Sequence, residues 1–133
     1  MKNLPYIMVI DDDEAPREML KDFLDSLGYT NIAFSDLTEA KTFLKSSPDI
    51  DLIILDVFLK GISSLPFVDY LKENGYADTP VIIISGAISP EYIQDAITKG
   101  VYDFIPKPFG LQHIKERIEN ALKFCLDKKQ SKK

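Results

Sequence analysis

The sequence contains a single cysteine, Cys125, and no tryptophan. One thiol cannot build a disulfide framework or a cysteine metal cluster, and such sparing use of cysteine is typical of a reducing compartment. No apolar stretch approaches the roughly 18 residues that span a bilayer. The apolar run near the N-terminus ends in three aspartates rather than in a small-residue cleavage site, which argues against a signal peptide. We therefore expect a cytoplasmic protein without membrane contact.

Positive charge is also scarce, because 21 acidic residues outnumber 16 basic ones and give a formal net charge of −5. An acidic surface is poorly suited to neutralise phosphates, so we expect no direct contact with nucleic acid. The one basic run lies at the C-terminus, at Lys128, Lys129, Lys132 and Lys133. We interpret residues 127–133 as a basic tail or the start of a linker, and residues 1–126 as one domain.

Short apolar segments without polar alternation recur along the chain. They predict buried strands at Tyr6–Ile10, Leu52–Leu55, Val81–Ile84 and Val101–Ile105, and a weaker strand at Asn31–Ser35. Continuous apolar strands are typical of a parallel sheet that is covered on both faces.

Helical patterns lie between these strands. Apolar residues from Met19 to Leu27 mark one face of a first helix, which Gly28 ends. Four further helices are predicted at Leu37–Leu44, Leu65–Leu71, Pro90–Ile97 and Leu111–Leu126. In the last of these, Leu111 has core-facing spacing. Because right-handed crossovers place helices on both faces of one parallel sheet, we predict an α/β, doubly wound (βα)5 fold with the flavodoxin-like strand order 2-1-3-4-5.

Polar residues follow four of the predicted strands. Asp11 and Asp12 follow the first strand, Asp56 the third in the sequence, Ser85 the fourth and Lys107 the last. In such sheets the ligand crevice lies beyond the carboxyl ends of the strands. We therefore expect three carboxylates, a hydroxyl and an ammonium group to converge there.

This convergence predicts a particular chemistry. Carboxylates at close quarters raise each other's pKa, and a hard cation such as Mg²⁺, which prefers oxygen ligands, relieves the repulsion. One carboxylate can then act as a nucleophile toward phosphorus. Mg²⁺ and Lys107 would offset the charge of the transferring group, and Ser85 could donate a hydrogen bond to it.

Four segments together resemble the receiver domain of bacterial two-component response regulators, the superfamily of the single-domain chemotaxis regulator. They are VIDDDE, LIILDVFLKG, VIIISGA and GVYDFIPKPF, in family-like order and separation. The resemblance runs from about Tyr6 to Phe124. It implies that Asp56 accepts a phosphoryl group and that Asp11, Asp12 and Asp56 hold Mg²⁺ together with the backbone carbonyl of Phe58.

The same resemblance implies three further roles. Lys107 would contact the phosphoryl group and be followed by a cis bond to Pro108, and Ser85 would move toward that group. Phe104 would be the aromatic residue whose rotamer changes in the switch, at a position where the family often has tyrosine.

The resemblance also implies partners. A histidine kinase or phosphotransfer protein would phosphorylate Asp56. The face formed by the helix Pro90–Ile97, the strand Val101–Ile105 and the helix Leu111–Leu126 would then change its affinity for a downstream protein or output domain, and could form a homodimer. The protein would be a signalling switch with self-phosphorylation and self-dephosphorylation chemistry, not an enzyme in the usual sense.

The segment after Asp56 departs from the family pattern. Lys60 and Ser64 stand where proline and glycine are usual, which puts the shape of residues 57–64 in question. Phe58 is bulky and apolar at a position that can screen an attacking water. We therefore expect slow self-dephosphorylation.

Two other functions stay open at this point. One is a receiver that acts unphosphorylated as a docking module. The other is a phosphatase of the haloacid dehalogenase type, but that family requires a second aspartate where this chain has Phe58. The chain could be a stand-alone regulator or the receiver of a longer protein.

Overall fold

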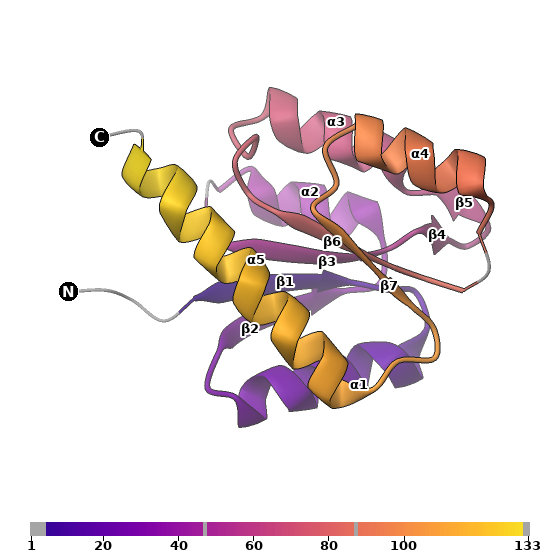
Figure 1. Ribbon diagram of the computed structural model, residues 1–133, viewed down its shortest axis with the longest axis horizontal. Coiled ribbons are helices and arrows are strands. Elements are labelled where there is room, and N and C mark those ends of the chain that lie inside the picture. Colours follow the sequence, from indigo (N-terminus) through magenta and orange to yellow (C-terminus); the bar gives the residue numbers. More distant parts are fainter. Residues whose placement is uncertain (1–4, 47, 87, 132–133) are drawn as a thin grey trace.

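The computed structural model describes residues 5–46, 48–86 and 88–131. Its main sheet is parallel and has five strands, namely β1 (Tyr6–Ile10), β2 (Thr30–Phe34), β3 (Leu52–Asp56), β6 (Val81–Ser85) and β7 (Asp103–Pro106) (Figure 1). Their order in the sheet is β2-β1-β3-β6-β7. This confirms the predicted order 2-1-3-4-5, because β4 and β5 are a separate small hairpin.

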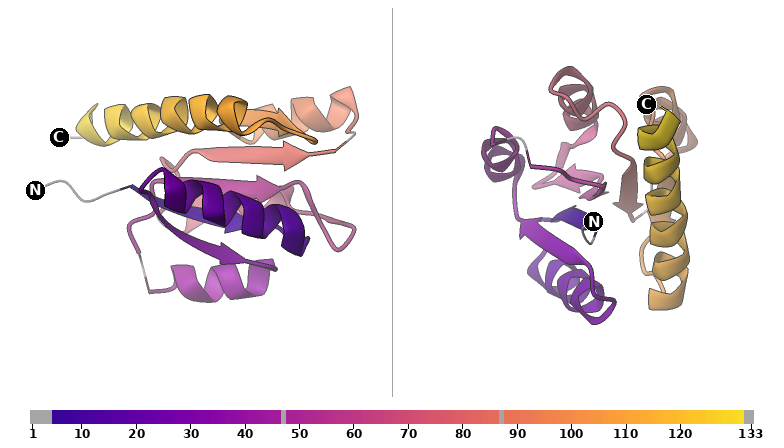
Figure 2. Two further views of the ribbon diagram at one scale, coloured as in Figure 1. Left: turned by 90° about the horizontal axis from the view of Figure 1, so that it is seen from below. Right: turned by 90° about the vertical axis from the view of Figure 1, so that its left-hand side faces the viewer.

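Helices cover both faces of this sheet, as Figures 1 and 2 show. The described residues form five helices, α1 (Glu14–Ser26), α2 (Leu37–Leu44), α3 (Leu65–Glu73), α4 (Pro90–Thr98) and α5 (Leu111–Ser131). One apolar cluster joins the sheet to α2, α3 and α4, and a second joins it to α1 and α5. The predicted doubly wound α/β architecture is therefore confirmed.

The central strand β3 shows why these strands read as continuous apolar runs. Its five residues are all buried. Ile53 and Leu55 belong to the cluster under α2, α3 and α4, whereas Leu52 and Ile54 belong to the cluster under α1 and α5. Since successive side chains of a strand point to opposite faces, a sheet covered on both sides needs apolar residues at every position.

Some boundaries differ from the prediction. Strand β7 begins at Asp103 rather than Val101, and α5 continues to Ser131 rather than ending at Leu126. Lys132 and Lys133 lie outside the described residues, and the division at residue 126 stays a prediction. The inward orientation predicted for Met19 and Leu111 is wrong, since they are 41% and 40% exposed. Leu111 opens its helix, and Met19 lies at the edge of the apolar stripe of α1, where burial is least complete.

The short hairpin of β4 (Phe58–Leu59) and β5 (Ile62–Ser63) was not predicted. Its two-residue turn, Lys60-Gly61, has positive φ at both positions, 52° and 78°. This is the type I′ pattern that matches the twist of paired antiparallel strands. Lysine is unusual at such a position, which is why the sequence did not reveal the turn.

None of the helices formed by the described residues is both long enough and apolar enough to cross a bilayer.

Candidate functional site

Three carboxylates meet at the carboxyl ends of β1 and β3. Carboxylate oxygens of Asp11, Asp12 and Asp56 lie within 4.8 Å of one another. The side chains of Asp11 and Asp56 are buried, with residue exposures of 1% and 8%, and Asp12 is more accessible. The predicted convergence of these three residues is confirmed as geometry.

Lys107 completes this cluster from the end of β7. Its Nζ atom lies 3.0 Å from Oδ2 of Asp56 and 3.4 Å from Oδ2 of Asp11. The backbone N–H of Lys107 donates to the carbonyl oxygen of Ser85 at 2.6 Å, which ties the end of β7 to the end of β6. The Lys107–Pro108 bond is cis, as the family resemblance implied.

The close charges change the pKa values of two groups. Burial, assisted by the charge of Asp56, raises the pKa of Asp11 to about 6, although the amide of Asp13 and the ammonium of Lys107 act in the opposite direction. Burial by itself would lower the pKa of Lys107, but its hydrogen bond to Asp56 and the negative charge of Asp11 raise that pKa above its ordinary value. Asp11 therefore resists ionisation in its buried position next to Asp56.

This pKa predicts how the stability of the metal-free protein depends on pH. Asp11 binds its proton more tightly in the folded protein than in the unfolded chain, where its pKa is near 3.8. Its contribution to stability is therefore complete below about pH 4 and is lost as the pH rises through about 6. In EDTA, we expect this residue to lower the free energy of unfolding by on the order of 2 kcal/mol between about pH 4 and pH 6.

Urea denaturation followed by circular dichroism measures this decline. The Asp11→Asn variant cannot ionise at this position, so its unfolding free energy should decline less over the same interval. Equal pH dependence in the two proteins would contradict the assignment to Asp11.

Backbone and side-chain donors orient the acidic pair. Oδ1 of Asp11 accepts the N–H of Asp13 at 2.9 Å, and the guanidinium of Arg17 donates to the carbonyl oxygen of Asp11 at 2.8 Å. Oδ2 of Asp12 accepts the N–H of Lys60 at 2.7 Å, which links this carboxylate to the turn of the hairpin. Arg17 and Lys60 were not predicted as parts of the site.

Ser64 anchors the other side of the hairpin and was noted in the sequence only as a departure from the family pattern. It is fully buried. Its hydroxyl contacts the carbonyl oxygens of Asp56 at 2.6 Å and Val57 at 3.0 Å, and its N–H donates to Val57 at 2.8 Å. A glycine at this position could not supply the hydroxyl. Ser64 therefore supports the backbone directly beneath the candidate acceptor.

We expect Ser64→Ala to lower the free energy of unfolding by about 1–2 kcal/mol, because it removes a buried donor from the Asp56 carbonyl. Ser26→Ala is the matched control, since the Ser26 hydroxyl also donates to a backbone carbonyl but at an exposed site. Urea denaturation of both variants measures the difference. Equal stability of the two variants would show that the buried hydrogen bond contributes nothing.

The two predicted switch residues lie at the carboxyl end of β6 and in β7. Asp56 pairs in register with Ile84, so Ser85 lies one residue beyond the partner of Asp56. Ser85 is buried, and its hydroxyl donates to the carbonyl oxygen of Gly86 at 2.9 Å. Phe104 is half-buried against the cluster under α4. In this state the hydroxyl of Ser85 is thus engaged by the backbone of the residue that follows it.

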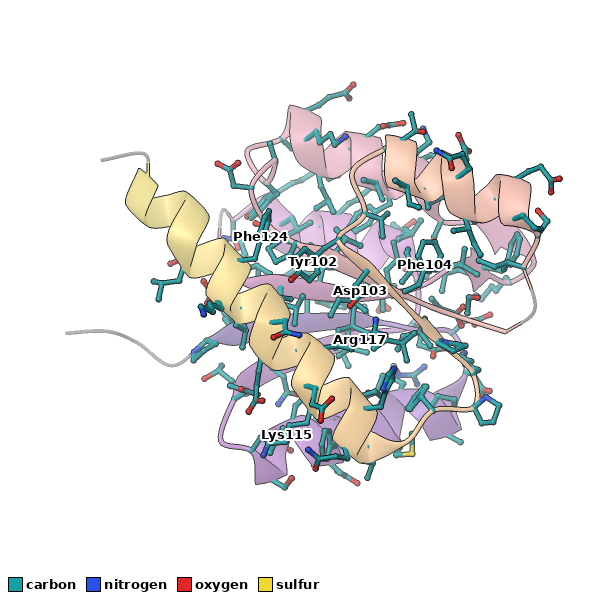
Figure 3. The ribbon with its side chains drawn as sticks, in the orientation of Figure 1. Tyr102, Asp103, Phe104, Lys115, Arg117 and Phe124 are labelled. Carbon is teal, nitrogen blue, oxygen red and sulfur yellow. The ribbon has the colours of Figure 1, made fainter. Side chains whose placement is uncertain are left out.

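Arg117 fastens α5 to the strand that carries Phe104. It forms an ion pair with Asp103 and donates to the carbonyl oxygen of Phe104 at 3.1 Å. Figure 3 shows these residues between α5 and β7. Phe124 lies further along α5, and its ring packs on Tyr102, which directly precedes β7.

Phe58 lies beside the acceptor and contacts α4. Its N–H donates to Oδ1 of Asp56 at 3.3 Å, and its side chain is 41% exposed. Its ring packs on the ring of Tyr92, with 5.3 Å between centroids. Sequence reasoning missed Tyr92, because a single aromatic residue in a helix gives no signal of a contact this distant in the chain. The prediction that the Phe58 carbonyl binds metal stays a prediction.

The fold and the crevice define the class of protein. It is a doubly wound α/β domain with a lysine-flanked carboxylate cluster at the carboxyl ends of its central strands. Residues 7–119 match the model of the response regulator receiver domain. The chain belongs to this family, the phosphoacceptor domains of two-component systems.

Individual relatives support this assignment. The regulatory protein VirG of Agrobacterium fabrum is 34% identical over 121 residues, which are 90% of this chain and 47% of VirG. A chemotaxis protein CheY homologue of Campylobacter jejuni is 28% identical, over 87% of this chain and 91% of the homologue. The solution structure of a beryllofluoride-activated NtrC4 receiver domain dimer has a TM-score of 0.83 and 32% identity, covering 90% of this chain and 98% of that chain.

These relatives differ in length. The chain spans 52% of the Bacillus subtilis regulator YvrH and 22% of an NtrX-like regulator of Rickettsia felis, whereas it spans most of the CheY homologue.

Proposed function

We propose that Asp56 accepts a phosphoryl group from a histidine kinase or phosphotransfer protein in a Mg²⁺-dependent reaction. The observation that carries this proposal is the cluster itself, in which the carboxylates of Asp11, Asp12 and Asp56 lie within 4.8 Å and the ammonium of Lys107 is 3.0 Å from Asp56. Family membership supports the same chemistry.

The donor set of the crevice fits Mg²⁺. It offers carboxylate oxygens, which are ligands that Mg²⁺ prefers. Burial, assisted by the charge of Asp56, raises the pKa of Asp11, and a bound cation would favour its ionised form. The carboxylates of Asp11, Asp12 and Asp56 and the carbonyl of Phe58 would hold the ion. When bound, Mg²⁺ supplies positive charge that offsets the charge of the phosphoryl group.

The residues of the chain have distinct tasks in the transfer. An oxygen of Asp56 forms a bond to phosphorus while the bond from phosphorus to the donor breaks, and the donor leaves with that electron pair. Lys107, which already contacts Oδ2 of Asp56, offsets charge on the phosphoryl oxygens. The buried hydroxyl of Ser85 then rotates from Gly86 toward the phosphoryl group and donates a hydrogen bond to it.

The rotation of Ser85 would be the first step of a switch. It would open space for Phe104 to pack further inward, and the surface of α4, β7 and α5 would change its affinity for an output domain, a partner protein or a second copy of this chain. The half-buried position of Phe104 between these elements supports this route (Figure 3). The cytoplasmic location expected from the sequence stays a prediction.

Incubation with acetyl phosphate tests the proposed function. The protein should gain one phosphoryl group per chain with Mg²⁺ and none in excess EDTA. A protein that stays unlabelled, and that Mg²⁺ with BeF₃⁻ does not perturb, would instead be a docking module. A haloacid dehalogenase-type phosphatase is not favoured, because Phe58 occupies the position of its second aspartate and the chain belongs to the receiver family.

A further inference from the structure

Tyr92, in the first turn of α4, contacts three parts of the segment that follows Asp56. Its ring packs on Phe58 with centroids 5.3 Å apart and planes inclined by 45°. Its hydroxyl forms a hydrogen bond with the Ser63 hydroxyl and lies 3.5 Å from the carbonyl oxygen of Val57. Figure 1 shows the hairpin of β4 and β5 beside the amino-terminal end of α4. Tyr92 thus connects α4 to both strands of the hairpin.

Phe58 is in turn connected to the acceptor. Its N–H donates to Oδ1 of Asp56 at 3.3 Å, so a phosphoryl group on that carboxylate would lie next to Phe58. The preceding residue, Val57, is buried in the core, whereas the Phe58 side chain is 41% exposed. A large apolar side chain in this exposed position needs a packing partner if it is to keep one orientation, and the ring of Tyr92 provides one.

The orientation of Phe58 matters for the loss of the phosphoryl group. In hydrolysis, a water oxygen forms a bond to phosphorus as the bond between phosphorus and the Asp56 oxygen breaks. The carboxylate is regenerated, inorganic phosphate leaves, and the proton lost by the water passes to phosphate or solvent. An apolar ring slows this reaction only while it occupies the path of the water.

We propose that Tyr92 is a positioning residue that holds Phe58 at the rim of the acceptor site and thereby lengthens the lifetime of the phosphoryl group. This inference rests on the proposed phosphorylation of Asp56. An aromatic pair of this kind changes the population of a packed arrangement by about two- to tenfold. We therefore expect Tyr92→Ala to shorten the half-life of the phosphorylated protein by about this factor.

The ring and the hydroxyl of Tyr92 can be separated. Tyr92→Phe keeps the ring that packs on Phe58 and removes the hydroxyl contacts with Ser63 and Val57. The half-life should therefore stay close to that of the wild type. Tyr92→Leu keeps apolar bulk against the core under α4 but removes the aromatic stack. Tyr92→Leu should also shorten the half-life, and it replaces Tyr92→Ala as the test variant if Tyr92→Ala folds poorly.

The experiment follows release of inorganic phosphate at fixed Mg²⁺ after the protein is phosphorylated and acetyl phosphate is removed. Tyr102→Ala is the matched control, because Tyr102 and Phe124 form a pair of nearly the same geometry, with centroids 5.0 Å apart and a 42° inclination. That pair lies at the opposite end of β7 from Lys107. The control should leave the half-life unchanged.

A double-mutant cycle separates positioning from a general structural effect. If Tyr92 acts through Phe58, then Tyr92→Ala should have no further effect in a Phe58→Ala background. An unchanged half-life in Tyr92→Ala and Tyr92→Leu would overturn the inference, and so would an equal shortening with and without Phe58. Failure of the wild-type protein to become labelled would instead contradict the proposed function of Asp56.

Discussion

The Asp56→Ala variant is expected to take up no phosphoryl group from acetyl phosphate, whereas the wild-type protein takes up one per chain. Asp56 lies at the carboxyl end of β3, and its carboxylate is the one that contacts Lys107 most closely, at 3.0 Å. Alanine removes the only atoms at this position that can form the bond to phosphorus. The loss should be complete, because Asp11 and Asp12 at the end of β1 are the residues proposed to hold the cation rather than to accept the phosphoryl group.

Intact-mass spectrometry after a timed reaction measures this result directly. Asp22→Asn is the control, since Asp22 is an exposed carboxylate of α1 and the variant should be labelled as fully as the wild type. Circular dichroism establishes that Asp56→Ala is folded. Labelling of Asp56→Ala at full stoichiometry would show that another residue is the acceptor.

The second large effect is expected on metal binding. Asp12→Asn should weaken Mg²⁺ binding by at least about 10- to 100-fold. Mutation of residues that only hydrogen-bond to a metal ligand already causes a loss of this size. Asp12 is a better choice than Asp11, because Asp11 also contacts Lys107 and its loss would rearrange the cluster. An asparagine can still accept the N–H of Lys60, which Asp12 accepts at 2.7 Å, so the hairpin should stay in place.

Titration of the protein with Mg²⁺, followed by calorimetry or by amide chemical shifts, gives the two affinities. Glu14→Gln is the matched control: it also removes one negative charge, from an exposed residue in the first turn of α1. Exposed charges at a distance are screened by salt, so this variant should bind Mg²⁺ nearly as well as the wild type. Equal weakening in both variants would indicate a general charge effect and not a ligand.

Several features of this protein could be predicted from local patterns in the sequence. Strand β3 is apolar at consecutive positions because both of its faces are buried. This pattern can be recognised in the short stretch of sequence that forms the strand. Asp11, Asp56 and Lys107 follow apolar strands, and the carboxyl ends of parallel strands lie at one edge of a sheet. Their convergence therefore followed from chain order and from the right-handedness of the crossovers.

Other features could not be predicted from the sequence, because they depend on contacts between distant segments of the chain. Val57 and Tyr92 are 35 residues apart, and no periodicity in either segment indicates that they meet. Ser64 looked like a departure from a pattern, yet its hydroxyl supports the backbone of Asp56 and Val57. The direction of the Ser85 hydroxyl, toward Gly86, also depends on the surrounding packing and not on the local sequence.

The sequence by itself thus determined the fold class and the set of charged groups at the site, since burial on two faces and strand polarity follow from residue type and order. Only the tertiary structure decided how the segment after Asp56 is held. Left-handed backbone at Lys60 and Gly61 folds this segment into a hairpin, and Tyr92 of α4 packs against it. That arrangement depends on how α4 lies beside β3 and the hairpin, which is a property of the assembled core.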